Sequence, residues 1–362
     1  MVGLYIHIPF CAKKCGYCDF ASYVGRQDAM EAYVDAVICE AQAYAGQAAD
    51  TVFIGGGTPS FLPPALFKRL VKGVGKHIDL SAACEFTVEA NPDSMDKTMA
   101  ECLKSLGATR VSMGLQAAQD ALLKSIGRIH TYADFLRALE AVQAAGFAHI
   151  NADLMYSLPG QTVAQVEESA RAVCNLGIDH LSAYALKLEE GTPMWGAAQP
   201  DEDTDRDMFY ALMETAEKAG FARYEISNFA RPGGECRHNL KYWRLEDYIG
   251  LGAAAHSCFE GARTANAAGL DEYIRLVGEA GNARVSCLPI SEKDREFENI
   301  MLRTRLREGI PRTMLGEGKA MADALEQLKK MGLAEEKDGR VLLTPRGMDV
   351  QNSVVIMLSE AL

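Results

Sequence analysis

Short runs of β-branched and apolar residues alternate with longer stretches of helical periodicity over the first two thirds of the chain. We predict strands at residues 4–8, 51–54, 85–89, 110–115, 149–154, 180–186 and, more weakly patterned, 223–226. The stretches between them that we predict as helices are residues 29–44, 63–76, 95–106, 132–145, 163–176 and 205–219. This alternation is typical of α/β proteins with parallel strands joined by crossover helices. Periodicity alone leaves open whether the sheet is a full barrel, a partial barrel or doubly wound.

The pattern changes after residue 230. Residues 231–269 are rich in Gly, Ala, Asn and His, and Leu288-Pro289 precedes a charged stretch, 291–307, that we predict as a helix. A further helix at 321–331 and a hairpin at 334–344, turning at Asp338-Gly339, predict a small helix-plus-wing module. We therefore divide the chain into a core, 1–230, a connecting segment, 231–289, and a small C-terminal domain, 290–362.

Composition and charge exclude several classes of function. The chain has 362 residues, 48% of them hydrophobic, and a formal net charge of −12, which is the balance of an ordinary globular protein. No cluster of Lys and Arg forms a basic patch, so we expect no nucleic-acid partner, even for the winged module. No signal sequence is apparent and no stretch of 18 apolar residues occurs, so we expect a cytoplasmic protein without a transmembrane segment.

Three of the ten cysteines are clustered directly after the first predicted strand. Cys11, Cys15 and Cys18 lie in one polar loop, and clustered thiols in a reducing compartment indicate a metal site or catalysis. A structural zinc site would need a fourth ligand, for which His7 is a candidate, although its spacing does not suit a compact knuckle. A 4Fe–4S cluster on three cysteines keeps one iron open for another ligand, and we favour it over zinc or unrelated buried thiols.

Polar and glycine-rich positions follow several predicted strands. Residues 55–58, Glu89, Gln116 and Asp153 each lie at or just beyond a carboxyl end, where parallel α/β folds place ligand sites. Residues 55–59 have a simpler interpretation as a tight turn with Thr58 as a helix N-cap. The two carboxylates could likewise be solvated strand ends. Three consecutive glycines, however, also let a ligand approach the backbone closely.

The cysteine spacing, with Tyr17 just before the last cysteine, resembles the signature of the radical S-adenosylmethionine (SAM) proteins. Within that superfamily, almost the whole chain resembles the oxygen-independent coproporphyrinogen III oxidase group. The matching segments are Tyr5-Ile-His-Ile-Pro-Phe-Cys11, Gly55-Gly-Gly-Thr-Pro59, Glu89-Ala-Asn-Pro92, Gly114-Leu-Gln116, Arg128-Ile-His130 and Asp153-Leu-Met-Tyr-Ser-Leu-Pro159. The resemblance implies a partial or full parallel β/α barrel with a small C-terminal winged-helix-like domain.

The same resemblance implies the ligands of the cofactors. The 4Fe–4S cluster is expected on Cys11, Cys15 and Cys18, and an electron donor is expected to reduce it so that SAM is cleaved. The residues expected to bind SAM are Tyr5, Tyr17, Gly56, Gly57, Thr58, Glu89, Gln116, Arg128 and Asp153. Carboxylates suit this role because they accept hydrogen bonds from ammonium and ribose hydroxyl groups.

Two departures distinguish the chain from the oxidases. Phe20 stands where the oxidases carry a further cysteine, and only ten residues precede Cys11. In addition, His238-Asn-Leu-Lys-Tyr-Trp243 matches the HNxxYW motif of the heme chaperones in this group. The resemblance then implies that heme is a cargo bound through His238 and passed to an acceptor heme protein, for example a respiratory one.

Other interpretations of these residues remain open. Histidine commonly ligates heme iron, but His238 alone would be interpreted as a hydrogen-bonded core or loop histidine. His256 is a second candidate heme ligand, and Cys258 is a third. The alternative activity is radical SAM decarboxylation of coproporphyrinogen III, and the chain could act as a homodimer. We assign no catalytic residue.

Overall fold

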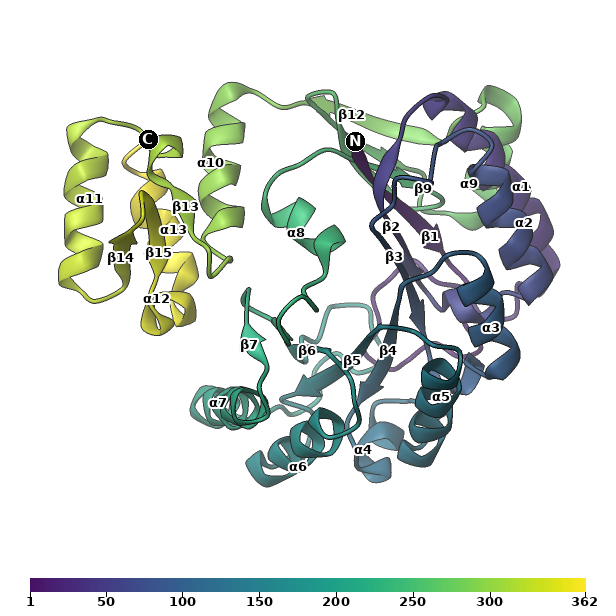
Figure 1. Ribbon diagram of the computed structural model, residues 1–362, viewed down its shortest axis with the longest axis horizontal. Helices are drawn as coiled ribbons and strands as arrows, with labels where there is room; N and C mark the ends of the chain where they lie inside the picture. Colours follow the sequence, from purple (N-terminus) through teal and green to yellow (C-terminus); the bar gives the residue numbers. More distant parts are fainter.

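The computed structural model describes residues 1–362 and contains a strongly curved sheet of twelve strands with helices on its convex face (Figure 1). The strand order is β12-β11-β10-β9-β1-β2-β3-β4-β5-β6-β8-β7. The first six strands run parallel: β1 (Val2–Ile8), β2 (Ala49–Gly56), β3 (Glu85–Ala90), β4 (Arg110–Gln116), β5 (His149–Tyr156) and β6 (His180–Ala185). The predicted α/β partial barrel is therefore confirmed.

Helices join the parallel strands and cover the outside of the barrel (Figure 1). They are α1 (Met30–Glu40), α2 (Pro64–Val74), α3 (Lys97–Ser105), α4 (Asp120–Ser125), α5 (Tyr132–Ala144), α6 (Val163–Cys174) and α7 (Glu202–Lys218). Local sequence sets several of their starts, since Thr131 and Thr162 each form a capping box with the third residue of the helix that follows. The parallel strands are mostly apolar and buried because helices cover one face and the barrel interior the other.

Residues 222–289 extend the sheet at both edges. On one side, β7 (Ala222–Arg223) and β8 (Asn228–Ala230) pair antiparallel next to β6. On the other side, β9 (Tyr248–Leu251) runs parallel to β1 and leads into the antiparallel strands β10 (His256–Phe259), β11 (Ala262–Asn266) and β12 (Arg284–Pro289). Two helices belong to this region, α8 (Arg237–Trp243) on the concave side of the sheet and α9 (Leu270–Ala280) on its outside (Figure 1).

A small C-terminal unit has its own core of fourteen buried apolar residues. It contains α10 (Glu292–Arg303), α11 (Lys319–Lys330), α12 (Pro345–Asp349) and α13 (Gln351–Ser359), with a sheet of β13 (Ile310–Pro311), β15 (Arg340–Leu343) and β14 (Ala334–Lys337). The predicted hairpin is present, and Asp338 and Gly339 at its turn have φ of 51° and 71°. None of the helices in the chain combines the length and apolar character that crossing a membrane requires.

Candidate cofactor site and a second cavity

A cavity of about 150 Å³ lies where the carboxyl ends of the parallel strands meet the cysteine loop. Of the twelve residues singled out above for the cluster and SAM, all but Tyr5 line it. These eleven are Cys11, Cys15, Tyr17, Cys18, Gly56, Gly57, Thr58, Glu89, Gln116, Arg128 and Asp153, joined by Phe20 from the same loop. The fold thus gathers residues from five successive segments of the chain into one place. The predicted site is a real cavity, although its ligands remain predictions.

The cysteine loop is held by hydrogen bonds that also reach the sulfur atoms. Thr58 donates its hydroxyl to Cys11 Sγ at 3.5 Å, and Arg128 donates Nη1 to Cys15 Sγ at 3.5 Å. Burial raises the pKa of the Cys11 thiol, and the Thr58 hydrogen bond opposes this shift by favouring the thiolate, which is the form that binds iron. No three His, Cys, Asp or Glu side chains converge as ligands of a single ion. A 4Fe–4S cluster binds each cysteine through a different iron, so the three thiols of one loop fit it without converging.

The glycine turn after β2 leaves room for close contacts that a side chain would fill. Gly56 has φ of +114°, and a Cβ on Gly57 would lie 2.9 Å from the carbonyl oxygen of Phe10 and 3.0 Å from Cys11 Sγ. Thr58 makes no side-chain cap to the following turn. Its hydroxyl instead accepts a hydrogen bond from Asn91 Nδ2 at 3.0 Å. The capping interpretation of Thr58 is therefore wrong, because its side chain faces the cysteine loop.

Two carboxylates share the floor of the cavity. Glu89 accepts a hydrogen bond from the Gly56 backbone N–H at 2.9 Å, and Asp153 accepts one from Asn151 Nδ2 at 2.7 Å. Burial, reinforced by the nearby Asp153 charge, raises the pKa of Glu89 to about 7, although the Gly56 bond opposes the shift. Burial also raises the pKa of Asp153. A cationic ligand would relieve this cost, and SAM carries an ammonium and a sulfonium group.

Arg128 and Gln116 complete the opposite wall. The Arg128 guanidinium donates to Asn91 Oδ1 at 3.0 Å and to the carbonyl oxygen of Gly114. Gln116 has a left-handed backbone, with φ of 76°, at an irregularity between β4 and β5. Non-glycine residues in this conformation are concentrated at functional sites. Asn91, which the sequence analysis did not single out, contacts both Thr58 and Arg128, and its place just after β3 was the available signal.

His238 lies away from this cavity, on α8 against the amino-terminal half of β2. Its ring is fully buried, with Nδ1 2.9 Å from Thr51 Oγ1 and Nε2 2.8 Å from the Tyr242 hydroxyl. Burial lowers the pKa of His238 to about 3, and the Lys241 charge adds to the shift, so the ring is neutral. Both ring nitrogens are occupied in this conformation, and the assignment of His238 as a heme ligand stays a prediction.

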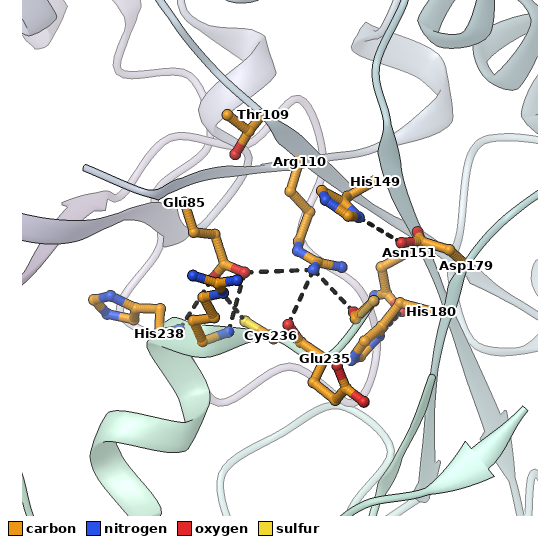
Figure 2. Close-up of polar contacts among 12 residues, drawn as sticks. Glu85, Thr109, Arg110, His149, Asn151, Asp179, His180, Glu235, Cys236 and His238 are labelled. Atoms are coloured by element: carbon orange, nitrogen blue, oxygen red, sulfur yellow. Dashed lines mark hydrogen bonds and ion pairs between the residues drawn. The ribbon is translucent and has the colours of Figure 1, made fainter. Parts of the chain in front are cut away.

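A buried charge network holds the start of α8 (Figure 2). Glu85 lies 3.4 Å from Arg110 Nη2 and accepts hydrogen bonds from the backbone N–H groups of Arg237 and His238 at 3.0 and 2.9 Å. Arg110 also donates to the carbonyl oxygens of Gly234 and Glu235 at 2.9 and 3.2 Å. These contacts anchor the HNxxYW segment to strands β3 and β4.

Tyr5 lines a second cavity of about 460 Å³, between the sheet, α8 and α10. The Tyr5 hydroxyl lies 2.9 Å from His7 Nδ1, and Tyr242 and Trp243 of the HNxxYW motif line the same cavity. His256 and Cys258 from β10 also line it. Phe20 lines both cavities, so the cysteine loop forms the wall between them. Tyr5 lines this cavity rather than the first, but burial raises the pKa of its hydroxyl and Glu89 is near enough for its charge to add to the shift. The assignment of Tyr5 to SAM stays a prediction.

Comparisons with known proteins agree with this architecture. The Radical SAM superfamily profile matches residues 5–173 and the HemN C-terminal domain profile matches residues 290–350. Heme chaperone HemW of Bacillus subtilis is 34% identical over 98% of both chains, and that of Escherichia coli is 35% identical over 86% of this chain and 84% of its own. The chain also shares its fold with the solved structure of coproporphyrinogen III oxidase (HemN) from Escherichia coli, which is described as a radical SAM enzyme. The TM-score is 0.85 at 22% identity, and the match covers 100% of this chain and 90% of that one. The chain therefore belongs to the HemW family of the radical SAM superfamily.

Proposed function

We propose that the protein is a heme chaperone that binds heme and passes it to an acceptor heme protein. The relatives named heme chaperone HemW extend over nearly the whole chain, which supports this function over that of an oxidase. The observation that carries the proposal is the 460 Å³ cavity, which combines aromatic walls from the HNxxYW motif with two residues able to ligate iron. Its volume lies within the range of about 300–1,000 Å³ typical of small-molecule sites.

The first cavity would hold the cofactors of the superfamily. Cys11, Cys15 and Cys18 would bind the 4Fe–4S cluster, which when bound would supply one electron to SAM from an external donor. Glu89 and Asp153 would accept hydrogen bonds from SAM, and Arg128 would offset the negative charge of the thiolates through its contact with Cys15. Gly56 and Gly57 would let the ligand lie against the backbone beside the loop.

The proposal extends to the setting in which the protein works. We place it in the cytoplasm, alone or as a homodimer, with a respiratory heme protein as one class of acceptor. The electron donor for the cluster would be a separate protein. Nothing in the acidic composition favours a nucleic-acid partner.

Two assays on the same anaerobically reconstituted protein separate the chaperone from an oxidase. Hemin is titrated into the protein and its absorption band is followed, and coproporphyrinogen III is incubated with the protein, SAM and a reductant. A chaperone gives saturable one-to-one hemin binding and no decarboxylation. Catalytic conversion of coproporphyrinogen III to protoporphyrinogen IX, or the absence of saturable hemin binding, would overturn the proposal.

A further inference from the structure

One face of the sheet extension forms the floor of the 460 Å³ cavity. Tyr5 on β1, Tyr248 on β9, and His256 and Cys258 on β10 all line the cavity, and Cys258 pairs in register with both Tyr248 and Arg263 of β11. Alternate residues of a strand point to the same face, which explains why His256 and Cys258 both reach the cavity. Tyr242 and Trp243 at the end of α8 close the other side. Tyr242 and Tyr248 meet edge to face with ring centroids 4.6 Å apart, so aromatic rings of the sheet and of α8 form a continuous wall of this cavity, which we call the slot. Aromatic walls suit a flat macrocycle.

The histidines near this slot differ in whether they can bind iron. His7 lines it, but its Nδ1 lies 2.9 Å from the Tyr5 hydroxyl and its Nε2 lies 2.9 Å from the Ala21 carbonyl oxygen. His238 has both ring nitrogens occupied and does not line the slot. The ring of His256 is solvent-exposed at the slot and takes part in no hydrogen bond or ion pair. A free imidazole nitrogen is the common axial ligand of heme iron.

Two hydrogen-bond donors at the slot lack partners. Arg263 pairs through Nη2 with Glu298 Oε2 at 2.7 Å, while its Nε is buried without a hydrogen-bond partner. The indole nitrogen of Trp243 is likewise buried without an acceptor. Buried donors are normally satisfied, and both residues line the slot, so a small turn of either side chain would present its free N–H to an acceptor group of a ligand there. The propionate carboxylates of heme are such acceptors, and an arginine binds them with charge-assisted hydrogen bonds.

From these observations we infer that heme occupies this slot with His256 as an axial ligand and with a propionate at Arg263. His238 then acts as a positioning residue, because its Nε2 fixes the hydroxyl of Tyr242 at the wall of the slot. Phe20, which is 60% exposed and lines both cavities, would lie between the porphyrin and the cysteine loop. The cargo would therefore touch the loop that holds the cluster. This inference rests on the proposed heme-binding function and adds the axial ligand and the propionate contact.

The test compares hemin titrations of the cluster-loaded wild type, His256→Ala and His77→Ala. His77 lies in the turn that follows α2 and lines neither cavity, so His77→Ala controls for the loss of a histidine. We expect His256→Ala to weaken hemin binding about tenfold or more, equivalent to about 1.4 kcal/mol. Its absorption spectrum should change, and added imidazole should restore the wild-type spectrum. Circular dichroism and iron content should stay unchanged because the His256 side chain is exposed.

The outcomes separate this inference from the proposed function. If His256→Ala binds hemin with the affinity and spectrum of the wild type, His256 is not the axial ligand, while the chaperone function stands. The same holds if the spectrum changes only in Cys258→Ser. A wild type that binds no hemin would overturn both. For the propionate contact, Arg263→Gln should weaken hemin binding but leave binding of heme dimethyl ester unchanged, and equal losses for both ligands would refute that contact.

Discussion

Replacing Glu85 by Ala should release α8 from the barrel and with it one wall of the 460 Å³ cavity. The side chains of Glu85 and Arg110 are 4% and 2% exposed and lie 3.4 Å apart, and Glu85 also accepts the N–H groups of Arg237 and His238. Removing one partner of a buried ion pair costs about 3–5 kcal/mol. Each backbone N–H left without an acceptor costs about 1–3 kcal/mol more, although these costs are not additive. We therefore expect a loss of about 4 kcal/mol or more in the free energy of opening this segment.

Tryptophan fluorescence provides a local assay, because the chain has two tryptophans and Trp243 is the last residue of α8. The other, Trp195, is 58% exposed and can be replaced by Phe. Urea titrations in the Trp195→Phe background would follow the environment of Trp243 directly. Asp35→Ala, which removes the exposed ion pair of Asp35 with Arg69, is the matched control and should cost less than about 1 kcal/mol.

A double-mutant cycle with Arg110→Met tests the reasoning itself. If Glu85 and Arg110 stabilise each other, the double variant should lose less free energy than the sum of the two single variants, by about 1 kcal/mol or more. Additivity within about 0.5 kcal/mol would refute the claim that the pair acts as a unit. The anchoring of α8 would be refuted if the midpoint of the Trp243 fluorescence transition lay at the same urea concentration in Glu85→Ala as in the Trp195→Phe parent.

Three further predictions follow from the cofactor cavity and the C-terminal unit. Burial raises the pKa of Glu89 to about 7, and we expect SAM to bind the carboxylate form of Glu89. The affinity for SAM, measured by calorimetry, should therefore rise with pH up to about 7 and level off above it. Glu89→Gln should flatten this profile. Cys15→Ala should lose the roughly four irons of the reconstituted cluster, whereas Cys84→Ala, outside the loop, should keep them; four irons in Cys15→Ala would contradict the ligand assignment. Gly347→Ala places a Cβ 1.9 Å from the Leu333 carbonyl oxygen. Thermal denaturation should show that it destabilises the C-terminal unit by about 1–3 kcal/mol. Gly316→Ala is the control and should not, because its Cβ meets no atom within 4 Å.

The sequence predicted those parts of the fold in which local pattern and burial agree. The six parallel strands are mostly apolar, and their carboxyl ends must meet at one edge of the sheet, so the cavity beside Cys11 could be expected from the positions of Glu89, Gln116 and Asp153. Strands β9–β12 could not be predicted in this way. They are four to six residues long, and β9 and β10 lie in a Gly- and Ala-rich stretch without a clear period of two.

The side chains of the second cavity show a different limit of sequence reasoning. The register puts Tyr5 on the same face of the sheet as Glu89, yet Tyr5 lines the cavity that Tyr248 also lines, which its place in the sequence does not indicate. His238 is buried because its ring meets Thr51, a residue 187 positions away. Contacts of this range depend on the assembled sheet, and no local pattern around the HNxxYW motif indicates them.

The most direct test of the account asks whether heme leaves the protein chemically unchanged. Heme-loaded, cluster-reconstituted protein is incubated with SAM and a reductant and then mixed with an excess of apomyoglobin, and the tetrapyrrole is identified by mass spectrometry in both proteins. A chaperone gives intact heme in the acceptor and a protein that can be reloaded with heme. A chemically altered porphyrin, or heme that stays on the protein, would contradict the claim that heme is its cargo.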